Sequence, residues 1–297
     1  MFLTWVISSE NTFSLGRTQD SEKSYAKACL PSPSNGRFRP KAAVPVPTAA
    51  TKNNDMIDNA GDTHLQIHYD TMWNRAFSAV AWGDIDCDAH LAAGHDVRRG
   101  LTLIARPGPA LKARFEFVLD RLALSEPQQY RYPATDMHVT ILPLFTAIEN
   151  PVSELARLND YIGSVHAALD GIDAFDIEFS GITMSRGAVL AQGFPCGPAL
   201  ETLRERLRAQ LRDAGLHASL DQRYRLITAH STLFRFIAPL SNPRHFAAQL
   251  ESLRHGQLGC MHVNEVELVV NDWYMSSSSL DRIERISLRP PVSNVGP

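Results

Sequence analysis

Two short segments each place a histidine and a threonine two residues apart. The segment HVTI begins at His138, and the segment HSTL begins at His230. Both lie in stretches typical of β-strands, and side chains at positions i and i+2 of a strand point to the same face. We therefore expect His138 to stand beside Thr140, and His230 beside Thr232.

Two such pairs facing each other across a cleft would suit phosphodiester chemistry. Cleavage of a cyclic phosphate needs a base for the attacking water and an acid for the departing oxygen. Imidazole, with an unperturbed pKa of about 6.5, can do either near neutral pH. We expect His138 and His230 to be this acid and base. We expect Thr140 and Thr232 to donate hydrogen bonds to the non-bridging phosphate oxygens, where charge grows in the transition state.

The chain around the two motifs repeats itself. The stretches RRGLTLIARPGPAL and RGAVLAQGFPCGPAL each read as a strand, and the GPAL that ends each of them begins an amphipathic helix. Gly108 precedes His138 by 30 residues, and Gly197 precedes His230 by 33. We therefore predict a duplicated strand–helix–strand unit, whose pseudo-two-fold axis would bring the two motifs face to face.

The remaining patterns alternate between helical and strand-like. Together they predict an α+β fold: a bilobal, pseudo-two-fold duplicated unit with two mostly antiparallel sheets, flanking helices and a central cleft. The further helices are expected at about residues 69–82, 151–169 and 242–254, and the further strands at about 175–185, 263–275 and 282–288.

The N-terminal stretch differs in composition from the rest. Its first 55 residues hold five prolines and show no sustained period of 2 or 3.6. We expect a disordered leader over residues 1–60 and one domain over residues 61–297, with lobes carrying motifs at 138–141 and 230–233. A translation start at Met56, or a targeting segment, is an alternative explanation of the leader.

The charge distribution favours a small substrate. Residues 1–55 hold seven basic and four acidic residues, a net +3, so the remaining 22 basic and 28 acidic residues give −6. Affinity for long nucleic acids requires many phosphate-neutralising Lys and Arg side chains. We expect a nucleotide or an RNA end as partner, with no tracking along nucleic acid and no membrane contact. A cytoplasmic monomer is expected, since the four dispersed cysteines suggest no disulfide framework.

The paired motifs resemble the paired H-x-[ST]-hydrophobic signature of the 2H phosphoesterase superfamily, which includes bacterial 2′-5′ RNA ligase and cyclic phosphodiesterase proteins. The resemblance spans about residues 97–289. It implies metal-independent hydrolysis of a 2′,3′-cyclic phosphate to a 2′-phosphomonoester, without a cofactor. The same architecture could instead serve a 2′-5′ RNA ligase, or a binding module that holds a nucleotide or RNA end without turnover.

Arg235 stands where ligase-like members of that superfamily often carry a basic residue, and it could reach phosphate. By strict alternation it points away from His230, so a bulge or a long reach would be needed. Ser231 fills a position that is often apolar, which would slightly weaken packing on the far face of the strand.

No metal site is expected. His64 and His68 have the spacing of helical metal ligands but lack an evident third ligand. The acidic loop at residues 84–88 lacks the glycine and glutamate of a calcium loop. Several aromatic residues near the inferred strands could stack on a base, but each is explained more simply as core: Tyr130, Tyr132, Phe145, Tyr224, Phe234, Trp273 and Tyr274. For Arg98 and Arg99, a solvated strand end is favoured over a phosphate contact.

Overall fold

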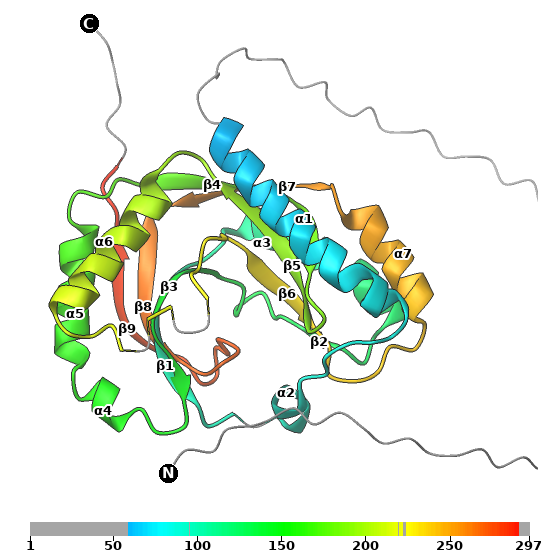
Figure 1. Ribbon diagram of the computed structural model, residues 1–297, viewed down its shortest axis with the longest axis horizontal. Coiled ribbons are helices and arrows are strands. Elements are labelled where there is room, and N and C mark those ends of the chain that lie inside the picture. Colours follow the sequence, from blue (N-terminus) through cyan, green and yellow to red (C-terminus); the bar gives the residue numbers. More distant parts are fainter. Residues whose placement is uncertain (1–58, 95, 219, 222–223, 291–297) are drawn as a thin grey trace, which may run out of the picture. The chain divides into compact units, whose positions relative to one another are not determined.

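The computed structural model describes residues 59–290 except 95, 219, 222 and 223 (Figure 1). The predicted leader over residues 1–60 lies outside the described residues, apart from its last two, which begin helix α1 (Asn59–Ala81). The predicted continuation of the domain beyond residue 290 lies outside them as well. Within the described range, no helix is both long and apolar enough to cross a bilayer.

The described residues form two antiparallel sheets, as the sequence predicts. The first sheet has the strand order β3-β1-β8-β9 and the second has β2-β6-β5-β4-β7. The strands of the first sheet are β1 (Arg99–Ala105), β3 (Val139–Ile148), β8 (Glu265–Asn271) and β9 (Asp281–Ser287). Those of the second are β2 (Tyr130–Arg131), β4 (Phe175–Met184), β5 (Ala188–Pro195), β6 (Ser231–Arg235) and β7 (Gln257–Val263).

Helices cover the outer face of each sheet (Figure 1). Besides α1, the helices of the described residues are α2 (Ala89–Ala93), α3 (Pro109–Ser125), α4 (Val152–Leu155), α5 (Leu158–Leu169), α6 (Ala199–Asp213) and α7 (Pro243–Leu253). Helix α6 packs on β3 of the first sheet and on α5, whereas α1, α3 and α7 pack on the second sheet. The bilobal α+β prediction is therefore confirmed.

The duplicated unit is present as β1–α3–β3 and β5–α6–β6. In each copy the helix leaves its own strand, packs on the sheet of the other copy, and is followed by a strand that pairs back with the first. The predicted apolar stripes of the two helices are buried: Leu111, Phe115, Val118 and Leu122 in α3, and Leu200, Leu203, Leu207 and Leu211 in α6. Each copy thus contributes to both lobes.

Three details differ from the predicted elements. Helix α1 begins at Asn59 instead of near Tyr69, because Tyr69 is its first buried apolar residue and the preceding turns show no apolar stripe. The helix predicted over 151–169 is divided into α4 and α5. Strands β2 and β7 were not predicted, because β2 has only two residues and most residues of β7 are exposed.

Tyr69 joins α1 to the second sheet through hydrogen bonds to β5. Its buried hydroxyl donates to the Gly193 carbonyl at 3.0 Å and accepts from the Gly193 N–H at 3.3 Å. We predict that Tyr69→Phe lowers the free energy of unfolding by roughly 1–3 kcal/mol, because both backbone groups would stay buried without that partner. Urea denaturation measures the loss. Tyr161→Phe is the control, since within the described residues no hydrogen bond of its hydroxyl is found. Equal losses in the two variants would contradict the prediction.

Candidate active site

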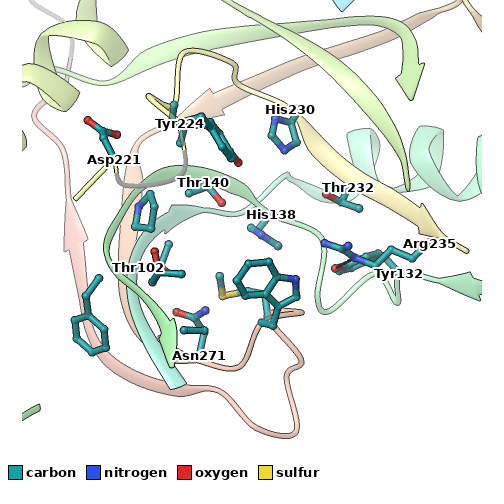
Figure 2. A pocket seen from close by; sticks show the side chains of 17 residues that line it. Thr102, Tyr132, His138, Thr140, Asp221, Tyr224, His230, Thr232, Arg235 and Asn271 are labelled. Atoms are coloured by element: carbon teal, nitrogen blue, oxygen red, sulfur yellow. Dashed lines mark hydrogen bonds between the residues drawn. The ribbon is translucent and has the colours of Figure 1, made fainter. Parts of the chain in front are cut away.

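A cleft of about 210 Å³ opens between the two sheets. The five residues singled out in the sequence all line it: His138, Thr140, His230, Thr232 and Arg235. Figure 2 shows the two histidines and the two threonines pointing into a common space, with Arg235 at one end of it. The structure therefore brings together residues that lie about 90 positions apart in the chain.

A β-bulge lies within the first motif. Thr140 is opposite Ile104 and Leu142 is opposite Leu103, so Ile141 is an extra residue on β3. A bulge of this kind shifts the phase of the strand by one residue. Pro143, three residues after Thr140, consequently faces the cleft as well.

The second motif has a bulge at the same place. Thr232 is opposite Leu190 and Phe234 is opposite Val189, so Leu233 is the extra residue on β6. From the second residue of each motif onward, the sequence of burial is the same in the two strands: buried, half-buried, buried, buried, half-buried. The pseudo-two-fold relation thus extends to the irregularity of the strands.

The second bulge corrects one expectation. Strict alternation directed Arg235 away from His230, but the extra residue Leu233 returns Arg235 to the cleft face beside Thr232. The bulge that a cleft-facing Arg235 requires is therefore present. Its equivalent in the first lobe is Pro143, so of these two equivalent positions only the one in the second lobe carries a cation.

His138 has a fixed tautomer when neutral. Its Nδ1 lies 2.7 Å from the backbone carbonyl oxygen of Asp136, which can only accept, so Nδ1 carries the proton. The loop before His138 is held in turn by Arg106, which donates to the carbonyl oxygens of Thr135 at 2.8 Å and Met137 at 3.4 Å. The ring nitrogen left for a substrate is Nε2.

His230 has a different partner. Its Nδ1 lies 2.7 Å from the hydroxyl oxygen of Thr228, which can donate or accept. On the other face of the strand, the hydroxyl of Ser231 is fully buried and has no hydrogen-bond partner within the described residues. The two histidines thus occupy equivalent places but differ in the group that faces Nδ1.

Both imidazoles favour the neutral form in the free protein. Burial lowers the pKa of His138 to about 4, against the opposing effect of its hydrogen bond to the Asp136 carbonyl. Burial also lowers the pKa of His230 to about 4, and the neighbouring His138, Arg204 and Arg235 act in the same direction. A bound anion would oppose these effects, because negative charge favours the imidazolium form.

Arg235 is oriented by aromatic residues. Its Nε donates to the hydroxyl of Tyr132 at 3.1 Å, and its guanidinium lies 5.5 Å from the ring centroid of Tyr274. Burial raises the pKa of Tyr132, so its hydroxyl keeps a proton that it can donate into the cleft. Within the described residues, no hydrogen bond involves the Nη atoms of Arg235, which are therefore available to an anion.

Sequence reasoning missed two polar residues deep in the cleft. Thr102 on β1 and Asn271 at the end of β8 both line it and are at least nine-tenths buried. The Nδ2 of Asn271 donates to the Asp272 carbonyl at 2.7 Å, and its Oδ1 has no partner within the described residues. Neither strand carries a motif, so only the alternation of polar and apolar residues at their ends could have indicated these positions.

The acidic loop considered as a metal site has other partners. Asp84 and Asp86 pair with Arg186, and Asp88 caps α2 and accepts from Tyr274. Among the described side chains, no group of three or more His, Cys, Asp or Glu is placed to hold a metal ion. Of the aromatic residues considered for base stacking, Tyr132, Phe145, Tyr224 and Trp273 line the cleft, whereas Tyr130, Phe234 and Tyr274 do not. Tyr224 is 64% exposed, so its interpretation as a core residue is wrong. Arg98 pairs with Asp96 and lies over Trp273, and Arg99 donates to nearby carbonyls.

Residues 107–273 match the family model described as the 2′-5′ RNA ligase superfamily. The match covers more than half of the chain and includes both motifs. The chain belongs to this superfamily of 2H phosphoesterases. Membership supports a phosphodiesterase-like activity in broad terms. Among curated proteins, no sequence match is found.

Several solved structures are similar to this chain. TT0787 of Thermus thermophilus is 18% identical, with a TM-score of 0.47 over 65% of this chain and 99% of that chain. LigT of E. coli complexed with 3′-AMP is 14% identical, with a TM-score of 0.41 over 65% and 99%. Usb1 of Kluyveromyces marxianus is 12% identical, with a TM-score of 0.37 over 63% and 98%.

The protonation of the two histidines can be tested directly. We predict that in the free protein His138 and His230 titrate well below pH 6.5, since burial disfavours the charged ring. Inorganic phosphate should raise both pKa values, because the anion favours imidazolium. NMR titration of the ring signals, assigned with His138→Gln and His230→Gln, measures both effects. Titration at or above pH 6.5 in the free protein would show that the cleft is not dry enough to depress these groups.

Proposed function

We propose that the protein hydrolyses a 2′,3′-cyclic phosphate on a nucleotide or RNA end to a 2′-phosphomonoester, with His138 and His230 as acid and base. The observation that carries the proposal is the convergence of two imidazoles, two threonine hydroxyls and one arginine in a single cleft. The net charge of −6 outside the first 55 residues supports a small substrate or a nucleic-acid end.

The polar side chains of the cleft suit a phosphate anion. Thr140 and Thr232 can each donate a hydrogen bond, and Tyr132 adds a third hydroxyl beside the guanidinium of Arg235. Because the position equivalent to Arg235 in the first lobe is Pro143, we place the non-bridging oxygens toward Arg235. Charge developing on these oxygens in the transition state is stabilised by the same donors.

We base the roles of the two histidines on the group that faces Nδ1 in each ring. His138 faces a carbonyl that stabilises its protonated ring, so it is the acid. His230 faces a hydroxyl instead of a carbonyl, and its neighbours include Arg204, whose charge opposes protonation, so we assign it as the base. Arg235 opposes protonation of both rings and does not distinguish them. Burial lowers the pKa of both rings, so the assignment rests on the group that faces each Nδ1.

Each proton and bond in the proposed step is accounted for. The oxygen of a water molecule bonds to phosphorus while His230 takes one of its protons. The bond between phosphorus and the 3′-oxygen breaks, and the 3′-oxygen takes the proton of His138. The product carries a 2′-phosphate and a free 3′-hydroxyl. Exchange of both protons with solvent restores the starting state.

Turnover tests the proposal. Purified protein should convert 2′,3′-cyclic AMP to 2′-AMP, whose position of phosphorylation is identified by chromatography against 2′- and 3′-AMP. His138→Ala and His230→Ala should each lower kcat by at least about 10²-fold, because each removes one proton transfer. The pH profile of kcat/KM should be bell-shaped and displaced toward acid, since burial lowers the pKa of both histidines. EDTA should leave the rate unchanged.

The alternatives give different outcomes in the same assay. Activity that survives both histidine substitutions contradicts the acid–base assignment, and loss of activity in EDTA indicates a metal-dependent reaction instead. Nucleotide binding without turnover favours a binding module. The matched family model prompts a test of ligation with RNA ends that carry a cyclic phosphate and a 5′-hydroxyl, because ligation uses the same groups in the reverse transesterification.

Arg235 should act mainly on the phosphate. We predict that Arg235→Met raises KM and lowers kcat/KM by about 10²-fold, because a charge-assisted contact to the phosphate is lost. Steady-state kinetics on 2′,3′-cyclic AMP measures it. Arg225→Met is the control, since Arg225 is exposed and pairs with Glu205 and Glu201. An equal loss in both variants would mean that general charge, not a local contact, attracts the substrate.

A further inference from the structure

Arg204 on α6 is a buried cation close to both motifs. It is 1% exposed. Its Nε donates to the carbonyl oxygen of Ile141 at 2.8 Å, and its Nη2 donates to those of Thr140 at 3.1 Å and Thr228 at 2.8 Å. None of these acceptors is a carboxylate, although buried arginines are usually paired with one. The guanidinium thus joins the strand of the first motif to the segment that leads into the second.

The bulge in β3 explains why a donor is needed at this place. β3 is the edge strand of its sheet, and Ile141 is the extra residue of the bulge. A bulge leaves backbone groups outside the ladder, and a buried carbonyl without a partner destabilises the fold. In the second lobe the carbonyl of the corresponding residue, Leu233, accepts from the N–H of Tyr132 at 2.9 Å. Arg204 therefore supplies the hydrogen-bond donor for the bulged carbonyl of the first motif, as the N–H of Tyr132 does for that of the second.

The duplicated helices differ at this position. When the two GPAL segments are aligned, Leu200 corresponds to Leu111 and Arg204 corresponds to Phe115. Phe115 is fully buried and packs edge-on against Phe179. An apolar side chain is sufficient in α3 because the bulged carbonyl of β6 already has a donor. The arginine is therefore specific to the helix that packs behind β3.

We infer that Arg204 is a positioning residue, which holds the two motif strands at the separation that lets His138 and His230 act on one phosphate. The inference rests on the proposed function. Arg204 acts on the second motif through Thr228, whose carbonyl it binds and whose hydroxyl contacts the Nδ1 of His230. Reacting groups displaced by about 1 Å can lose roughly 10²-fold in rate.

Arg204 also contributes charge near the base. The charged and titratable groups that act on His230 are His138, Arg204, Arg235 and His68, and all of them disfavour its protonation. Removal of the Arg204 charge should therefore raise the pKa of His230. This effect separates a residue that supports the site from one that only stabilises the fold.

Two variants separate the geometry from the charge. Arg204→Lys keeps the charge, but one ammonium cannot replace the planar guanidinium at three carbonyls. Arg204→Gln keeps two N–H donors without the charge. We expect kcat on 2′,3′-cyclic AMP to fall about 10- to 100-fold in both, with KM changed less than about threefold. NMR titration should show a raised His230 pKa in Arg204→Gln and a smaller change in Arg204→Lys.

Glu126→Gln is the control for loss of a buried charged group outside the cleft. Glu126 is as buried as Arg204, and its carboxylate accepts from the backbone N–H groups of Ser241 and Asn242, none of which lines the cleft. The variant should lose thermal stability, while kcat and the His230 pKa stay unchanged.

Folded Arg204 variants with unchanged kcat and an unchanged His230 pKa overturn the inference. If Arg204→Gln does not fold, unchanged kcat in folded Arg204→Lys overturns it. If the parent protein shows no turnover, the proposed function fails, and the His230 titration in the parent and in Arg204→Gln still decides whether Arg204 supports the second motif.

Discussion

The bulge at the fourth residue of each motif is the constraint on which the cleft depends. In a regular strand, the residue three places after a cleft-facing threonine would point into the core. The extra residues Ile141 and Leu233 reverse that phase. The cleft is therefore lined by His138, Thr140 and Pro143 from one motif, and by His230, Thr232 and Arg235 from the other. Each bulge also leaves a backbone carbonyl outside the ladder, and this carbonyl needs a donor from elsewhere. Arg204 donates to the carbonyl of Ile141, and the N–H of Tyr132 donates to that of Leu233.

The duplication places the two motifs in equivalent positions, and the differences between the copies give the two histidines different surroundings. Two equivalent strands bring two imidazoles to one volume, but identical surroundings would give them identical pKa values. The copies differ at the position three residues after the threonine, where one has Arg235 and the other Pro143. They differ again at Nδ1, which faces a carbonyl at His138 and a hydroxyl at His230. In the proposed mechanism these differences decide which imidazole acts as the acid and which as the base.

The sequence predicted the parts of the fold that depend on local patterns. The period of 2 around each motif and the helical stripe after each GPAL identified both repeats, and hence the two sheets. The orientation of Arg235 could not be derived in the same way, because a bulge depends on register with the neighbouring strand. Arg204 lies within the leucine stripe of α6 and was passed over, although a charged residue in such a stripe is itself a signal. Thr102 and Asn271 reach the cleft from strands without a motif.

Burial of the charged groups in the cleft has opposite effects on phosphate binding and on the protonation of the histidines. Low polarity strengthens the attraction between Arg235 and a phosphate, yet the same burial keeps both histidines neutral when the cleft is empty. A neutral pair can supply the base but not the acid. In the proposed mechanism a bound phosphate favours protonation of His138, because its negative charge offsets both the burial of the ring and the charge of Arg235. If the proposed mechanism holds, the charge of the substrate itself supplies the protonation state needed for its cleavage, and an uncharged ligand of the same shape would leave His138 unprotonated.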